Sequence, residues 1–86
     1  MWSVYLLQHS ERKTFYVGVT SNLKQRFAQH NANANKSTRR KTGKWILVYA
    51  EAYRSKQDAY TREARLKQRG RAKQELLKRV NKSVLN

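Results

Sequence analysis

The fold is decided by the stretch WSVYLLQHSERKTFYVGV at positions 2–19. Residues 2–7 (WSVYLL) and 15–19 (FYVGV) are rich in aromatic and β-branched side chains, as strands are. The polar residues 8–14 (QHSERKT) between them have the composition of a hairpin loop. We therefore predict an amino-terminal hairpin. Gly18, inside its second strand, predicts a place where a backbone or a ligand comes close.

Three further segments follow this hairpin. Leu23 and Phe27 are spaced by one helical turn, which predicts a short helix over about 22–33. Residues 33–44 show no apolar periodicity and are predicted to be a basic loop. Residues 45–53 (WILVYAEAY) are the strongest strand pattern in the chain.

Two helices are expected after this third strand. Ser55 with Asp58 three residues later resembles a capping box, which begins a helix that ends near residue 69. Gly70 is then a candidate C-cap, and residues 71–81 are expected to form a last short helix. The predicted order is β-β-α-β-α-α, a three-stranded sheet with helices, which is an α+β fold.

The composition bounds the function before any motif is considered. Eighty-six residues make one small domain, 1–86, and 20 Lys and Arg against five acids give a net charge of +15. Such a field favours a polyanion, most commonly nucleic acid, whereas a surface made basic for solubility mixes both signs. Anionic lipid is the other polyanionic surface considered.

Other features of the composition concern location and cofactors. Cysteine is absent, which excludes disulfides and thiolate metal sites and fits a cytoplasmic location. The longest apolar run, residues 45–50, is too short to span a bilayer, so no membrane association is expected. The first fifteen residues are too polar for a signal peptide.

The inventory of reactive side chains predicts a sparse site. The sequence has no carboxylate cluster for a two-metal centre, no glycine-rich phosphate loop and no His/Cys ligand set. A catalytic site here has at most one carboxylate, together with tyrosine, histidine and arginine.

Glu63 is the most informative of the five acids. It shares a predicted helix stripe with Ala59, Leu66 and Gly70, which places a carboxylate on a small or apolar face. Charged groups are rarely buried unless they are paired or bind a metal. From the helix alone, a structural salt bridge to one of the many bases and a functional carboxylate both stay open.

Two further pairs carry candidate chemistry. Arg26 and His30 are at i, i+4, where the arginine can grip a phosphate and the histidine can move a proton, or both can be an ordinary solvated face. Tyr5 and Tyr16 come from the two strands of the hairpin, where their hydroxyls can meet near a water or phosphate. Simple packing of the two rings is the alternative.

Taken in order, these residues resemble the GIY-YIG nuclease family. Ser3-Val4-Tyr5 stands at the first motif of that name and Tyr16-Val17-Gly18 at the second. The resemblance covers residues 2–80 and is closest in character to the compact stand-alone branch, similar to the N-terminal nuclease domain of the excision repair incision subunit. Ser3 replaces the first glycine. Some family members carry an asparagine where this chain has Gln74 and Glu75, so no such role is carried over.

The resemblance implies a small three-stranded antiparallel sheet flanked by helices, and metal-dependent hydrolysis of a DNA phosphodiester. Glu63 would be the one protein ligand of a single Mg²⁺ or Mn²⁺ ion. Tyr5 would act on the attacking water, as general base or through a neighbour, and Tyr16 would hydrogen-bond the water or the scissile phosphate. Arg26 would stabilise charge on the phosphoryl oxygens, and His30 would make a supporting proton or phosphate contact.

Phosphate contacts are expected from basic side chains of the loop and the later helices: Lys36, Arg39, Arg40, Lys41, Lys44, Arg65 and Arg69. The sequence thus favours an endonuclease, by resemblance one with a role in DNA repair. The alternative is a nucleic-acid-binding module that keeps the fold and cuts little. Duplex, nicked, branched and single-stranded DNA all stay open as substrates, as do RNA and a homodimer mate or protein partner that directs the enzyme.

Overall fold

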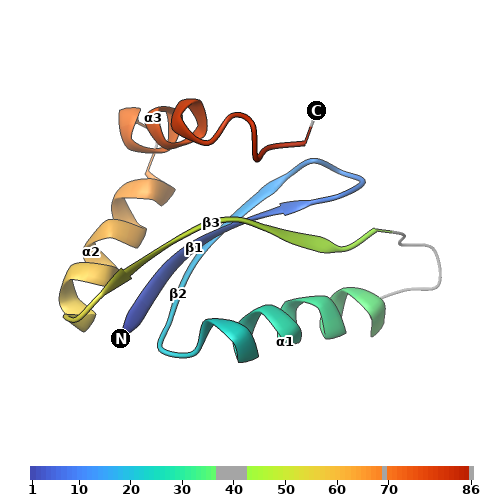
Figure 1. The fold of residues 1–86 in the computed structure, drawn as a ribbon, viewed down its shortest axis with the longest axis horizontal. Helices are drawn as coiled ribbons and strands as arrows, with labels where there is room; N and C mark the ends of the chain where they lie inside the picture. The colour runs from blue at the N-terminus through green and yellow to red at the C-terminus, as the bar shows by residue number, and fades with distance from the viewer. Residues whose placement is uncertain (37–42, 69, 86) are drawn as a thin grey trace.

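The computed structural model describes residues 1–36, 43–68 and 70–85, without the side chains of 33–36. Within these ranges it has one antiparallel three-stranded sheet and three helices, in the predicted β-β-α-β-α-α order (Figure 1). The elements are β1 (Trp2–His9), β2 (Phe15–Thr20), α1 (Leu23–Lys36), β3 (Trp45–Tyr53), α2 (Lys56–Lys67) and α3 (Arg71–Arg79). The predicted α+β fold class is confirmed.

The central strand of the sheet is β1, in the order β2-β1-β3. Both neighbours pair with it antiparallel, so Tyr5 lies opposite Gly18 on one side and Ala50 on the other. Residues 4–9 of β1 are all buried. A strand that is paired on both edges and covered on both faces loses the usual alternation of buried and exposed positions, which explains its nearly continuous apolar sequence.

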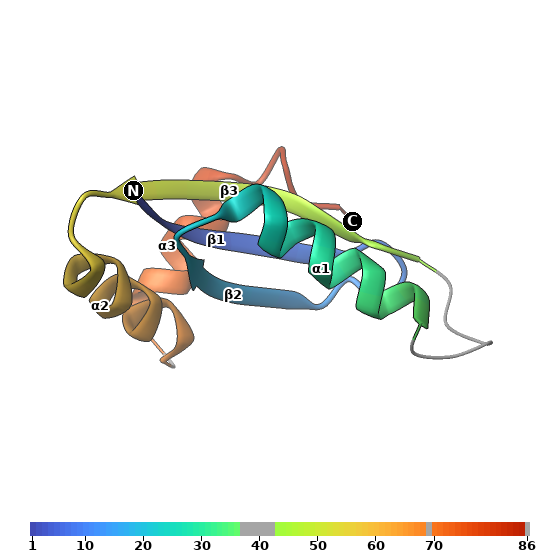
Figure 2. The ribbon, with the colours of Figure 1, turned by 90° about the horizontal axis from the view of Figure 1, so that it is seen from below.

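The two faces of the sheet have different partners. Val4, Leu6 and Val17 join Ala59, Leu66 and Leu76 in the hydrophobic core, so α2 and α3 cover this face. Tyr5 and Tyr16 belong to the opposite face, where they contact His30 of α1. Figures 1 and 2 show α1 and α3 on opposite sides of the sheet, with α2 across one end.

Two sets of side-chain hydrogen bonds position the helix that covers the tyrosine face. Asn22 Oδ1 accepts a hydrogen bond from the amide of Gln25 at 3.1 Å, which makes Asn22 the cap at the start of α1. Further along, the Asn31 side chain accepts from Trp45 N at 2.8 Å and donates to Trp45 O at 3.3 Å. Asn31 thereby fixes α1 to the start of β3.

The structure corrects three predicted boundaries. The first strand continues to His9 and the first helix to Lys36, beyond the predicted ends at 7 and 33. Ser55 caps α2 as predicted, accepting from Asp58 N at 3.2 Å. The C-cap prediction for Gly70 is wrong, because α2 ends at Lys67 and Gly70 precedes α3. Glycine is also accepted at the position before a helix, and Gly70 takes that position in an extended conformation.

None of the helices in the described parts of the chain is long and apolar enough to cross a membrane.

Candidate active site

Tyr5 lies at the centre of the candidate site. Its ring is buried on the middle strand, and its hydroxyl is 3.1 Å from Nε2 of His30 on α1. Burial is the main cause that raises the pKa of Tyr5, opposed by the nearby Arg26 guanidinium. The phenol is therefore held in its protonated form at neutral pH, with a histidine nitrogen in hydrogen-bonding reach.

Gly18 makes room for the Tyr5 ring. A Cβ atom on Gly18 would collide with the Tyr5 hydroxyl and lie within 2.9 Å of its Cε1. The close approach expected at this glycine is confirmed, and the group that approaches is the tyrosine of the adjacent strand. Register places these two residues directly opposite each other.

Tyr16 and His30 complete an aromatic cluster around Tyr5. The Tyr16 and His30 rings meet edge to face, with centroids 4.6 Å apart, and Tyr5 lies 6.2 Å from Tyr16. Burial is the main cause that lowers the pKa of His30, and the Arg26 charge adds to this. At neutral pH the imidazole is therefore neutral and can accept a proton.

Arg26 lies on the solvent side of this cluster, one helical turn before His30. Its interactions with the hydroxyls of Tyr5 and then Tyr16 raise its pKa, so the guanidinium stays charged. The side chain is exposed, and its Nη1 donates a hydrogen bond to Gln29 Oε1 at 3.4 Å. An exposed guanidinium beside two phenol groups is suited to bind the oxygens of a phosphate.

Glu63 approaches the cluster from α2. Its charge is the smallest of the contributions that raise the pKa of Tyr5, after burial and the neighbouring Tyr16. The side chain is 18% exposed, and Oε2 forms an ion pair with Lys67 Nζ at 3.1 Å, one turn along the helix. Lys67 itself is 52% exposed, so solvent reaches the pair and screens it.

Besides the ion pair at Glu63, a second half-buried salt bridge is found at another acid. Glu51 on β3 accepts from Arg62 Nε at 2.7 Å and from the Tyr53 hydroxyl at 2.7 Å. Burial and then this hydrogen bond raise the pKa of Tyr53 to about 12. Both oxygens of Glu51 are thus engaged within the fold, and Arg62 and Glu63 face different partners although they are adjacent in sequence.

The residues present fit a single divalent ion. No group of three or more His, Cys, Asp or Glu side chains that could share a metal occurs within 1–36, 43–68 and 70–85. Mg²⁺ keeps most of its waters and is commonly held by one or two carboxylates together with substrate phosphates. Glu63 can supply such a carboxylate once Lys67 moves aside, and a DNA phosphate would supply the remaining oxygens.

Two of the seven predicted phosphate contacts, Lys44 and Arg65, have described side chains. Lys44 is exposed just before β3, and Arg65 is exposed on α2, more than half a turn around the helix from Glu63. Neither residue joins the Tyr5 cluster. Lys36 ends α1, but its side chain lies outside the described part of the structure, and Arg39, Arg40, Lys41 and Arg69 lie outside the described residues altogether.

Trp45 is a neighbour of the site that the sequence reasoning did not single out. Its ring lies 6.2 Å from Tyr16 and 6.3 Å from His30, centroid to centroid. It lies before the bulge of β3 in the pairing with β1, which falls at Val48, and it is the residue held by Asn31. The sequence does not indicate that Trp45 lies beside the site, because only the packing of α1 brings His30 next to this ring.

Comparison with known proteins gives consistent results. The model of the GIY-YIG catalytic domain matches residues 1–76. A UPF0213 protein of Halobacterium salinarum is 36% identical over 77 residues, which span 90% of this chain and 99% of that protein. A UPF0213 protein of Vibrio campbellii is 34% identical over 76 residues, or 88% of this chain and 72% of its own.

A solved structure agrees with the fold. The solution NMR structure of a UPF0213 protein from Bacillus halodurans superposes with a TM-score of 0.54 at 29% identity, covering 90% of this chain and 82% of that one.

Proposed function

This chain belongs to the GIY-YIG family, a family of nucleases that act on DNA, and from that premise we propose that it is a metal-dependent endonuclease. It would hydrolyse a DNA phosphodiester with Tyr5, Tyr16, Arg26, His30 and Glu63. The observation that carries the proposal is the hydrogen bond between Tyr5 and His30 at 3.1 Å, with Arg26 interacting with both tyrosine hydroxyls. These residues come from β1, β2, α1 and α2.

The protonation states support a relay that begins at Tyr5. With its proton on Nδ1, a neutral His30 accepts a hydrogen bond from the Tyr5 hydroxyl at Nε2. Tyr5 would take a proton from the attacking water while it passes its own proton to His30. The raised pKa of Tyr5 and the lowered pKa of His30 set only the resting state of this relay, in which the phenol is protonated and the imidazole is neutral.

The charges around the site support binding of the phosphate. Arg26 would neutralise the negative charge that develops on the phosphoryl oxygens, and Tyr16 would orient the water or the phosphate. Glu63 would hold one Mg²⁺ or Mn²⁺ ion, which when bound polarises the phosphoryl group as a Lewis acid. Gly18 keeps the space that allows Tyr5 to lie flat in this arrangement.

A nucleic-acid-binding module with little cleavage is the second candidate. The observation that favours it is the ion pair between Lys67 and Glu63, which occupies the carboxylate that a metal needs. In that case the charge of +15 would hold DNA while the tyrosines serve only to pack the sheet against α1.

One assay separates the two candidates. Labelled duplex, nicked, branched and single-stranded DNA are incubated with the protein in Mg²⁺, in Mn²⁺ and in EDTA. An endonuclease gives defined products in the metal arms and none in EDTA. Binding without products for every substrate and both metals would leave the binding module as the function.

A further inference from the structure

One face of α2 carries an ordered series of side chains that includes Glu63. Lys56, Tyr60, Glu63 and Lys67 follow one another at intervals of four, three and four residues, so they form one stripe along the helix. Lys56, Tyr60 and Lys67 are exposed, while Ala59 and Leu66 of the same helix point into the core. The carboxylate of the proposed active site therefore stands between an aromatic ring and a lysine on an open surface.

The aromatic end of this stripe is a contact between two rings. Tyr60 is 45% exposed, and its ring meets that of Trp2 edge to face, with centroids 5.9 Å apart. Lys56 Nζ lies 5.2 Å from the Trp2 ring centre and 5.6 Å from that of Tyr60. An exposed aromatic ring beside a cation is the combination with which proteins hold single-stranded nucleic acid, the ring for a base and the cation for its phosphate.

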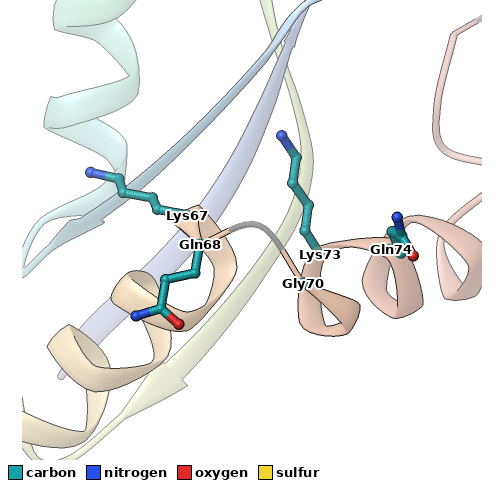
Figure 3. A pocket seen from close by; sticks show the side chains of 5 residues that line it. All are labelled: Lys67, Gln68, Gly70, Lys73 and Gln74. Atoms are coloured by element: carbon teal, nitrogen blue, oxygen red, sulfur yellow. The ribbon is translucent and has the colours of Figure 1, made fainter.

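The other end of the stripe leads into a basic pocket between α2 and α3. It has a volume of about 380 Å³ and is lined by Lys67, Gln68, Gly70, Lys73 and Gln74. In Figure 3 the Lys67 and Lys73 side chains extend toward the strands, whereas Gln68 extends away from them. Lys73 Nζ lies 5.7 Å from the Phe15 ring, so this lysine reaches back over β2.

We propose that this face of α2 holds a single-stranded stretch of DNA, with an unpaired base stacked on Tyr60 and a phosphate held by Lys67 and Lys73. The inference rests on the proposed function for one point only, that the scissile phosphate lies at Glu63. The base would then lie on one side of the cut and the second phosphate on the other.

The dimensions of the stripe suit a few nucleotides. A helix rises about 1.5 Å per residue, so Lys56 and Lys67 are about 16 Å apart along the axis, against about 3.4 Å per nucleotide of a stacked strand. In a duplex both faces of each base are covered by its neighbours, and Tyr60 has no base to stack on. The preferred substrate is therefore DNA with unpaired nucleotides beside the cut, such as a flap, a fork or a single strand.

The test measures binding without cleavage. Fluorescence anisotropy in EDTA gives the Kd of the full chain for three DNA probes. They are an oligothymidylate of twelve nucleotides, an abasic strand of the same length, and a duplex. Each is titrated with the wild-type protein, Tyr60→Leu and Tyr60→Phe. Leucine keeps apolar bulk against Trp2 but removes the ring, whereas phenylalanine keeps the ring, and thermal melting confirms that both variants fold.

The expected result is selective for the bases. Tyr60→Leu should weaken binding of the oligothymidylate on the order of tenfold and leave the Kd values for the abasic strand and the duplex unchanged. Tyr60→Phe, which keeps the ring, should bind all three probes as the wild type does. Equal weakening for all three probes, or no weakening at all, would overturn the proposal. The readout does not depend on catalysis, so a protein that stacks bases without cutting contradicts only the proposed function, and one that cuts without base-dependent binding contradicts only this inference.

Discussion

Two carboxylates of this protein stand in half-buried positions and have opposite surroundings. Glu51 is 19% exposed and has both oxygens engaged, one by Arg62 and one by Tyr53. Glu63 is 18% exposed, but its ion-pair partner Lys67 is an exposed side chain one turn along the same helix. The two carboxylates are therefore equally buried but differ in whether they can bind a further ligand. A carboxylate in a basic protein is available for function when its counter-charge can move into solvent.

The largest expected effect is that of Glu63→Gln on cleavage. The amide keeps the size of the side chain but removes the charge that a divalent ion requires. We expect the cleavage rate to fall on the order of a hundredfold or more, while the melting temperature changes little, because Lys67, the partner in the lost ion pair, is exposed. Cleavage kinetics at saturating DNA and Mg²⁺, measured beside a thermal melt, check both parts.

The control for this variant lies in DNA binding. DNA affinity in EDTA should hold or rise, since one negative charge near the polyanion is gone. A Glu63→Gln protein that cleaves at the wild-type rate would assign Glu63 to structure alone.

The matched substitution Glu51→Gln should show the opposite result. It leaves Arg62 without its anion inside the fold, which we expect to cost about 1–2 kcal/mol of unfolding free energy because the pair is only partly buried. For a domain of this size each kcal/mol lowers Tm by about 4–8 °C. Cleavage per folded molecule should stay close to wild type below the melting range, and a loss of cleavage without a loss of stability would contradict the assignment.

Titration of His30 should set the pH dependence of cleavage near neutral pH, whereas Tyr53, with its pKa raised to about 12, should not contribute. The pKa of His30 is lowered below its ordinary 6.5 by burial and by Arg26, so the neutral acceptor persists as the pH falls through 6.5. We expect the rate to be constant above pH 6.5 and to drop up to about tenfold per pH unit once the pH passes below the lowered pKa. A pH–rate profile of wild type against His30→Gln tests this, and the same acid limb in both proteins would remove His30 from the relay.

The smallest expected effect is that of Lys67→Gln on metal use. This change frees Glu63 from a surface ion pair that is typically worth about 0.3–0.5 kcal/mol at the i, i+4 spacing. The Mn²⁺ concentration for half-maximal cleavage at saturating DNA should therefore fall by about twofold. An unchanged or higher requirement would mean that Lys67 does not compete with the ion for the carboxylate.

The first strand, which carries Tyr5, could be located from the sequence because a strand depends on local pattern. Residues 2–7 carry enough aromatic and branched side chains to form a strand in any packed context, and 45–53 were bounded correctly for the same reason. The cap at Ser55 is also a local interaction, within one turn of helix. Gly70 was misassigned because the same residue type suits the end of one helix and the start of the next.

The sequence by itself determined the class of fold, the net positive charge and which side chains are candidates for the site. Only the tertiary structure decided which acid stabilises the fold, because the ion pair of Glu51 and Arg62 joins β3 to α2. The contact of His30 with Tyr5 joins residues 25 positions apart and exists only because α1 crosses the face of β1 opposite the core. Local chemistry selects strands, caps and charges, but burial and charge pairing depend on distances that exist only after the sheet and helices have packed.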